Sequence, residues 1–392
     1  MATVAKRRFH LFSSNIDKSL LLSMLVLYIF GSFMIISAEM GNNAGSTAII
    51  ISTAIKQILF FILGLIGFVF TSRLNLLSIR RELYEIVYWI MLVLLLIPRL
   101  FFRASNGAYG WIYIFGFSFQ PSELAKVFII LYGARLLGRD MGKKNYENLV
   151  TFAKKAFYYF LIILFIQHDL GSAAVLFLIA YCIALIPPYP QLSKIQGIMR
   201  KLVIFAIPLI LLVLSPIGTS FLKKLSGDYR IARFLSSANP FEYIYDDGYH
   251  LVMSLISIAT GGWFGLGYGN SIHKYMNFPN PSNDFILPVI IEEMGIVFGL
   301  LPVVILYIIM LVTLFRYGLK VKYASHKMVL LGSFMYLVVH FILNVGGVSG
   351  LIPLTGVPLL LVSSGGTSAI ATFLAIGLSE YVISSYKKET DI

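Results

Sequence analysis

Asp284 is the residue whose type and position most clearly allow chemistry. It follows Pro281-Ser282-Asn283 and lies just before a long apolar run, where a helix should begin. The dipole of that helix favours a carboxylate near its N-terminus, so the side chain should be ionised and able to accept a proton. The same position would suit a helix N-cap without a chemical role. Glu292 lies further along on about the same side and could be a second polar group, whereas Glu293 points elsewhere; either could instead bind a neighbouring helix.

Glu123 and Lys126 form a second candidate, within Gln120-Pro121-Ser122-Glu123-Leu124-Ala125-Lys126. Their spacing places both on one face of a helix, and Pro121 suits its first turn. Ionisable groups at membrane depth are costly and are functional candidates by default. Two interpretations stay open: a self-neutralising pair that packs helices, or a Lys126 that faces an anionic group in a cavity. Asp169, after the Gln167-His168 break, fits an N-cap better than a catalytic role.

Residues 220–285 form one long connection that is rich in aromatic residues, glycine and charge. Loops of this length are usually functional or disordered, and this composition does not match a disordered linker. Arg230, Arg233 and Lys274 are its main cations, placed where a diphosphate or lipid headgroups could bind. They could equally be ordinary solvated charges. The glycines from Gly261 to Gly269 let backbone pass close to a ligand or a helix, or simply make turns.

Composition identifies the elements that must position these residues. Of the 392 residues, 58% are hydrophobic and only 12% are charged, and the mean hydropathy is +0.84. A soluble domain carries about 25% charged residues, so this chain faces lipid. The cations behind the net charge of +13 therefore indicate which side of the membrane each loop lies on. We expect no nucleic-acid partner. Cys182 is the only cysteine, which excludes an intrachain disulfide, and no metal-ligand spacing or nucleotide-binding glycine loop is present.

The apolar runs predict an all-α polytopic membrane protein with about ten transmembrane helices, forming one integral-membrane domain over residues 1–392. A turn at Gln167-His168-Asp169 separates two antiparallel spans, and the run 286–315 is long enough to tilt or to extend beyond the lipid. The large loop 220–285 then lies between helices 7 and 8. The predicted spans are 19–38, 50–71, 84–102, 121–138, 156–167, 170–188, 201–219, 286–315, 328–348 and 357–385.

Ten spans with an internal N-terminus place most of the 31 Lys and Arg residues on the cytoplasmic side, as the positive-inside rule requires. Both termini are then cytoplasmic and the loop 220–285 is external. Cysteine labelling should find Ser236 accessible from outside and Asn145 only from inside.

Several ordered motifs resemble the SEDS family of membrane glycosyltransferases, the FtsW/RodA/SpoVE group, over nearly the whole chain. Asn239-Pro240-Phe241 and the Asp-Phe-Ile context look more like FtsW than RodA. The motifs are Trp111-Ile112 with Gln120-Pro121-Ser122-Glu123 and Lys126, Gln167 to Ser172, the loop 248–269, Asn283 to Ile286 with Glu292 to Gly295, Asn344-Val345-Gly346, Pro353 to Pro358, and Ser363 to Ser368.

Four positions depart from the family pattern. Gly110 stands where the family has an arginine before Trp-Ile, so an anion contact could be lost or supplied by Arg103. His168 replaces a proline, His250 a glutamine and Ser364 a tyrosine. These departures put individual ligand contacts in doubt more than the reaction class.

The resemblance implies a peptidoglycan polymerase that joins lipid II units at the outer face of the bacterial cell membrane, in division or in elongation. It implies Asp284 as the base and, for the substrate and its diphosphate, Lys126, Glu123, Arg230, Arg233, Lys274, Glu292, Ser363 and Thr367. A divalent cation, Mg²⁺ or Mn²⁺, could assist the diphosphate. The implied partners are lipid II, the growing glycan strand, a class B penicillin-binding protein and other division or elongation membrane proteins, at a location that could be the septum.

Two other functions stay open. A lipid II flippase without catalysis would need polar groups along a path through the bilayer, for which Glu123, Lys126, Asp169, Glu292 and Glu380 are the available set. A membrane scaffold for division proteins is compatible with either activity. The elaborate external loop favours the enzyme, because the set of polar groups within the spans is small.

Overall fold

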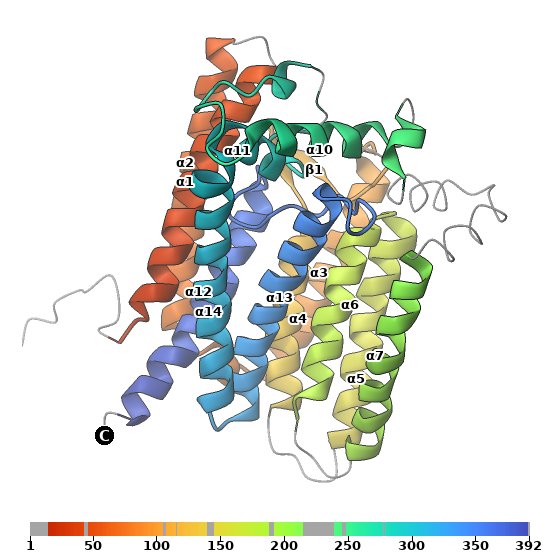
Figure 1. Cartoon of the computed structure of the whole chain (residues 1–392). Coiled ribbons are helices and arrows are strands. Elements are labelled where there is room, and N and C mark those ends of the chain that lie inside the picture. Colours follow the sequence, from red (N-terminus) through yellow and green to blue (C-terminus); the bar gives the residue numbers. More distant parts are fainter. Residues whose placement is uncertain are drawn as a thin grey trace, which may run out of the picture.

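Long helices packed side by side form most of this protein (Figure 1). The computed structural model describes residues 15–42, 46–104, 107–114, 116–138, 145–187, 192–214, 239–244, 248–276, 278 and 280–390. The helices of the bundle are α1 (Lys18–Asn42), α2 (Thr47–Arg73), α3 (Arg81–Phe101), α4 (Pro121–Leu137), α5 (Asn145–Leu161), α6 (Leu170–Leu185), α7 (Ser193–Leu214), α11 (Ile286–Gly295), α12 (Leu301–Lys320), α13 (Ala324–Val348) and α14 (Gly366–Thr390).

Shorter elements connect these helices. Single turns form η1 (Leu76–Ser78), η5 (Pro240–Tyr243) and η6 (His273–Tyr275), and π-helical segments form η3 (Ile162–Ile166) and η7 (Ile296–Leu300). Strands β1 (Ile112–Ile114) and β2 (Phe117–Phe119) pair antiparallel, with Tyr113 opposite Ser118. Helix α10 (Tyr249–Gly261) lies across one end of the bundle (Figure 1), where it contacts α11 and α13.

Every predicted span coincides with a helix, which confirms the polytopic all-α fold. Within the described residues, seven helical segments are long and apolar enough to cross a membrane, one of them the run Ile286–Lys320. Helices α4, α6 and α7 occupy the three remaining predicted positions. The last residues of the predicted span 201–219 lie outside the described part of the chain.

The starts of two predicted spans differ most from the observed helices. Helix α5 begins at Asn145 and not at 156, so its first turns carry polar residues. Lys155 belongs to this extension, where it pairs with Glu85 and lies over the Tyr88 ring at 4.4 Å. The last helix begins at Gly366 and not at 357. Residues 357–362 are apolar and almost all buried although they form no helix, which explains why hydropathy alone extended the span.

The run Ile286–Lys320 is broken and not one continuous helix. Gly295 has φ 71°, and the backbone groups freed there bond with the loop that follows α10. Leu266 N donates to Glu292 O at 2.9 Å, and Ile296 N donates to Gly262 O at 3.0 Å. Broken helices are tolerated at membrane depth only where the freed groups find partners inside the protein. The loop that follows α10 therefore packs against the break in this span and provides partners for its freed backbone groups.

Alanine at Gly265 should destabilise the fold much more than alanine at Gly269. Both residues have positive φ, 77° and 83°, which costs a non-glycine residue ~1 kcal/mol. A Cβ at Gly265 would also lie 2.3 Å from Glu293 O, whereas a Cβ at Gly269 meets nothing within 4 Å. Overpacking adds about 1–3 kcal/mol. Thermal unfolding of the two purified variants measures the difference; equal losses would mean that the loop does not pack against the helix break.

Candidate active site

Asp284 lies where three motifs of the sequence meet: Asn283 to Ile286, Asn344-Val345-Gly346 and Pro353 to Pro358. Its backbone carbonyl accepts a hydrogen bond from Asn344 Nδ2 at 2.9 Å, and the same amide donates to Val357 O at 2.9 Å. A Cβ on Gly356, which has φ 68°, would lie 3.6 Å from Asp284 Oδ2. Asn344 thus joins the start of α11 to the segment 353–358, and glycine at 356 leaves room beside the carboxylate.

The capping alternative for Asp284 does not hold. Phe285 occupies the N-cap position of α11, and no side chain caps this helix. The Asp284 carboxylate is half-buried and makes no hydrogen bond with any residue that the structure describes. Burial, together with the negative charge of Asp169, raises the pKa of Asp284 to about 6. A carboxylate that is not saturated by hydrogen bonds and has a raised pKa has the properties of a general base.

Asp169 caps α6, as predicted. Its Oδ1 accepts from Ser172 N at 2.9 Å, and its Oδ2 accepts from Gln120 Nε2 at 3.0 Å. Gln120 in turn donates its backbone N–H to Thr367 Oγ1 at 3.0 Å. Thr367 is therefore linked to the Asp169–Asp284 region. Ser363, by contrast, is buried and accepts from Leu359 N at 2.8 Å, so its hydroxyl stabilises a turn.

Glu123 and Lys126 form a buried ion pair on α4, with Lys126 Nζ 2.6 Å from Glu123 Oε1 and both residues 0% exposed. Tyr336 OH donates to Glu123 Oε2 at 2.9 Å, and His340 Nε2 lies 3.3 Å from Lys126 Nζ. The predicted pairing on one helix face is confirmed. Lys126 faces protein partners and not an open cavity. Ser172 Oγ, 3.5 Å from Lys126 Nζ and 3.4 Å from Gln120 Nε2, connects this pair to Asp169.

His340 and Tyr336 are the functional candidates that the sequence reasoning missed. His340 lies on α13 one turn before Asn344, so both belong to the same helix face. Its Nδ1 lies 3.1 Å from Pro358 O and donates to it, which leaves the Nε2 lone pair facing Lys126. A histidine inside an apolar span was the available signal, because ionisable residues at membrane depth are rare.

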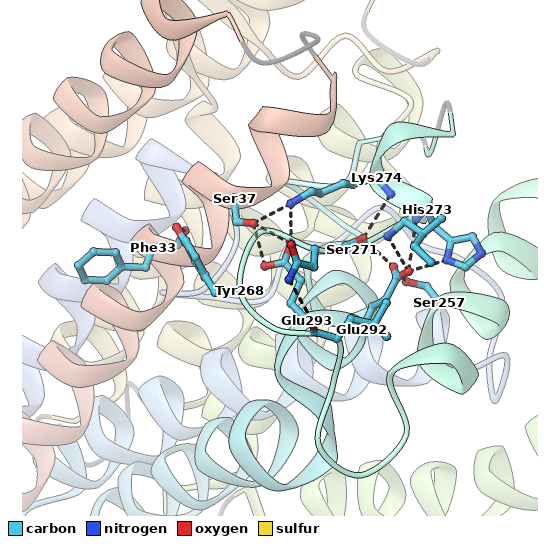
Figure 2. A network of polar contacts seen from close by, with 12 residues as sticks. Phe33, Ser37, Ser257, Tyr268, Ser271, His273, Lys274, Glu292 and Glu293 are labelled. Atoms are coloured by element: carbon cyan, nitrogen blue, oxygen red, sulfur yellow. Dashed lines mark hydrogen bonds and ion pairs between the residues drawn. The ribbon is translucent and has the colours of Figure 1, made fainter.

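Lys274 and Glu292 belong to a different network, drawn in Figure 2. Lys274 is 1% exposed and donates to Glu293 Oε1 at 2.6 Å and to Ser37 Oγ at 2.9 Å. Glu292 Oε2 accepts from Ser257 and Ser271, both at 2.6 Å, and its Oε1 lies 2.7 Å from His273 Nδ1.

This network fastens η6 to α11 and α1. Its carboxylates and its ammonium already have partners within the protein, which gives Lys274 and Glu292 a structural role. Their predicted contact with a diphosphate stays a prediction. Arg230 and Arg233 lie outside the described residues, so their predicted role stays a prediction.

A small space beside Asp169 marks the position of Gly110. A Cβ there would lie 3.5 Å from Gln120 Nε2, 3.7 Å from Asp169 Oδ2 and 3.8 Å from Gln167 Oε1. Gln167 Oε1 is buried and has no hydrogen-bond partner among the residues that the structure describes. The neighbouring Tyr109 ring carries the Arg99 guanidinium at 3.9 Å from its centre. Arg99 is therefore the cation stacked on the residue before Gly110, and an anion contact supplied by Arg103 stays a prediction.

The described residues contain no group of three or more His, Cys, Asp or Glu side chains that could hold a metal ion. A divalent cation that assists the diphosphate therefore stays a prediction, without a ligand set contributed by this part of the chain alone.

A multi-pass helical bundle with a free carboxylate at one end, beside a second aspartate, defines a membrane protein with an enzyme-like site. The family model of the cell cycle proteins FtsW, RodA and SpoVE matches residues 17–388. The chain belongs to this FtsW/RodA/SpoVE family.

Similar proteins cover almost the whole chain. The probable peptidoglycan glycosyltransferase FtsW of Enterococcus hirae is 32% identical over 382 residues, which cover 96% of this chain and 94% of the relative. FtsW of Bacillus subtilis, with the same description, is 30% identical over 92% of this chain and 89% of its own length. Stage V sporulation protein E of Bacillus subtilis is 30% identical over 82% and 84%.

Solved structures share the fold. A peptidoglycan synthase complex, described as coordinating polymerization and crosslinking, contains a chain that superposes with a TM-score of 0.68 at 25% identity and covers 95% of this chain and 99% of that one. The rod shape determining protein RodA of Thermus thermophilus superposes with a TM-score of 0.62 at 24% identity, over 94% of this chain and 96% of that protein.

Proposed function

We propose that this chain is a peptidoglycan glycosyltransferase that joins lipid II disaccharide units into glycan strands at the outer face of the bacterial cell membrane. The observation that carries the proposal is the Asp284 carboxylate, which does not cap its helix and has a pKa raised to about 6 beside Asp169. Its relatives from Enterococcus hirae and Bacillus subtilis, named peptidoglycan glycosyltransferases, support the same reaction class.

In the proposed reaction, the sugar 4-hydroxyl of lipid II attacks the anomeric carbon of the growing strand. The new bond joins that oxygen to the carbon, the bond from the carbon to the diphosphate breaks, and undecaprenyl diphosphate leaves. The α-linked donor thereby gives a β-linked product. Asp284 takes the hydroxyl proton, for which it must lie within hydrogen-bond reach of the oxygen. The Glu123–Lys126 pair, with Ser172 and Gln120, positions Asp169 next to this base.

The polar contacts within the spans argue against a flippase. A transport path would need polar groups that are free to contact a moving headgroup. Glu123 and Lys126 are satisfied by each other, by Tyr336 and by Ser172, and Glu292 accepts from several donors. Three of the five groups available to a flippase are therefore already satisfied within the protein, which favours the enzyme.

The proposed partner is a class B penicillin-binding protein. A role in division is favoured because relatives from Bacillus subtilis, Enterococcus hirae and Marinomonas mediterranea are named FtsW. The structural likeness to a chain of a peptidoglycan synthase complex supports an assembly of this kind. Lipid II, the growing strand and other division or elongation membrane proteins complete the proposed set, at a location that includes the septum.

Polymerisation of lipid II by the purified chain, with and without its class B partner, tests the proposal. We expect a ladder of glycan strands on a gel, sensitive to a muramidase. Transbilayer movement of lipid II without any strands would instead support the flippase.

Cysteine labelling tests the proposed orientation. The start of α1 contacts the end of α14, where Asp17 pairs with Lys387, and this end of the bundle is opposite α10 (Figure 1). With Cys182 replaced by serine, a cysteine at Asn239 should react with an impermeant reagent in intact cells, and one at Lys388 only after permeabilisation. Both positions are exposed, so burial does not bias the comparison. The reverse pattern would invert the topology and place Asp284 on the cytoplasmic side.

A further inference from the structure

We propose that His340 is a positioning residue of the proposed reaction, which holds the segment 353–358 against the Asp284 carboxylate. This inference rests on the proposed function, because Asp284 is the base of that reaction. His340 is 0% exposed, and each of its ring nitrogens faces a group of the protein, Lys126 Nζ or Pro358 O. Since these contacts occupy both nitrogens, His340 acts on the reaction through the backbone that it holds and not by touching a substrate.

The neighbours of His340 determine which of its ring nitrogens carries the proton. The Lys126 ammonium lies 3.3 Å from Nε2 and has only hydrogens to donate, so Nε2 must be the acceptor. Nδ1 then carries the proton and donates to Pro358 O at 3.1 Å. Glu123 Oε2 lies 3.8 Å from Nε2, beyond hydrogen-bond distance, and accepts from Tyr336 OH instead. The neutral ring of His340 therefore joins the buried ion pair of α4 to the backbone of the segment 353–358.

Helix α13 holds the segment 353–358 at two consecutive carbonyl groups. His340 donates to Pro358 O, and Asn344, one turn later on the same helix face, donates to Val357 O at 2.9 Å. Asn344 also donates to the backbone carbonyl of the proposed base, so it contacts the segment and the base together. The contact of His340 goes to the segment alone. Removing it should therefore loosen the segment while the backbone contact of the base remains.

The held segment packs against the base and against the helix that Asp169 caps. A Cβ on Gly356 would lie 3.6 Å from Asp284 Oδ2. A Cβ on Gly171, the second residue of α6, would lie 2.6 Å from Thr355 O, so the segment and the start of α6 are in close contact. A displacement of this segment would change the surroundings of the carboxylate. Misplacement of a reacting group by about 1 Å can lower a rate by about 100-fold, so His340 can affect turnover from a distance.

Two substitutions separate the contacts of His340 in the full chain. His340→Gln can place an amide oxygen near the position of Nε2, which keeps an acceptor for Lys126 but loses the donor to Pro358 O. It should lower kcat for strand formation by about 10- to 100-fold with little change in the KM for lipid II. His340→Asn can place its amide nitrogen near the position of Nδ1, which keeps the donor but leaves Lys126 without this acceptor. It should unfold at a lower temperature yet keep most of its kcat. His326→Gln, the same change at a half-buried position of α13, is the matched control.

Hydrogen exchange of the backbone amides from Leu354 to Val357, followed by mass spectrometry, tests the same contact without requiring turnover. These amides should exchange faster in His340→Gln than in the wild type, His340→Asn or His326→Gln.

Three results would overturn the role of His340. They are unchanged exchange in His340→Gln, faster exchange with a normal kcat, and losses of kcat that follow only the losses of stability in both His340 variants. A wild type that forms no strands, although its exchange depends on His340, would contradict the proposed function and leave the contact with Pro358 standing.

Discussion

Asp284→Asn should reduce glycan-strand formation by about 10²–10⁴-fold, the usual loss when a general base is removed. Asparagine keeps the size of the side chain, and the hydrogen bond from Asn344 goes to the backbone of residue 284, which the substitution retains. Folding and membrane insertion should therefore be unchanged. Lipid II binding should change little, because the base acts chiefly in the transition state. Glu389→Gln, the same chemical change at an exposed position of α14, is the control.

The pH dependence of the wild type gives an independent check on the same residue. Only the ionised carboxylate can accept the hydroxyl proton, and the pKa of Asp284 is about 6. Activity should therefore rise as the pH increases through about 6 and should level off above it. Initial rates of strand formation across this range measure the acidic limb. If activity instead rose near pH 4, where an ordinary aspartate titrates, burial and Asp169 would not raise the pKa of Asp284.

Lys126→Met should destabilise the protein by about 3–5 kcal/mol, because it leaves the fully buried Glu123 carboxylate without its cation. The double variant Glu123→Gln/Lys126→Met should recover most of that loss, since neither charge remains. Arg81→Met removes one partner of an exposed pair, 3.8 Å from Glu85, and should cost less than about 1 kcal/mol. Unfolding of the three purified variants measures these differences.

The same variants separate a structural pair from a substrate contact. If Lys126 instead bound a diphosphate, Lys126→Met would stay as stable as Arg81→Met yet lose polymerisation. Exchanging the two residues should not restore stability fully, because a carboxylate at position 126 would face the Nε2 lone pair of His340.

Local chemistry made some features predictable from the sequence. Hydropathy located each span, and the spacing of Glu123 and Lys126 placed both on one face of α4. The N-cap role of Asp169 followed from its position after a break. Each of these inferences depends on neighbouring residues only.

Features that depend on tertiary contacts could not be predicted in this way. Lys274 looks like an exposed loop cation, but Glu293 and Ser37 bury it, and Ser37 lies far away in the sequence. Residues 357–362 look like a span because they are apolar, although they pack as irregular chain. Asp284 lies beside the segment 353–358 through a tertiary contact, because Asn344 of α13 donates to both Asp284 O and Val357 O.

Reconstitution of the chain with its class B partner and lipid II in one vesicle preparation tests the central claim most directly. Strand formation and transbilayer movement of lipid II are measured together, for the wild type and for Asp284→Asn at equal amounts of inserted protein. We predict β-linked strands from the wild type and almost none from Asp284→Asn. Near-normal strand formation by well-inserted Asp284→Asn, or lipid II movement without strands from the wild type, would contradict the assignment of Asp284 as the base of a glycosyltransferase.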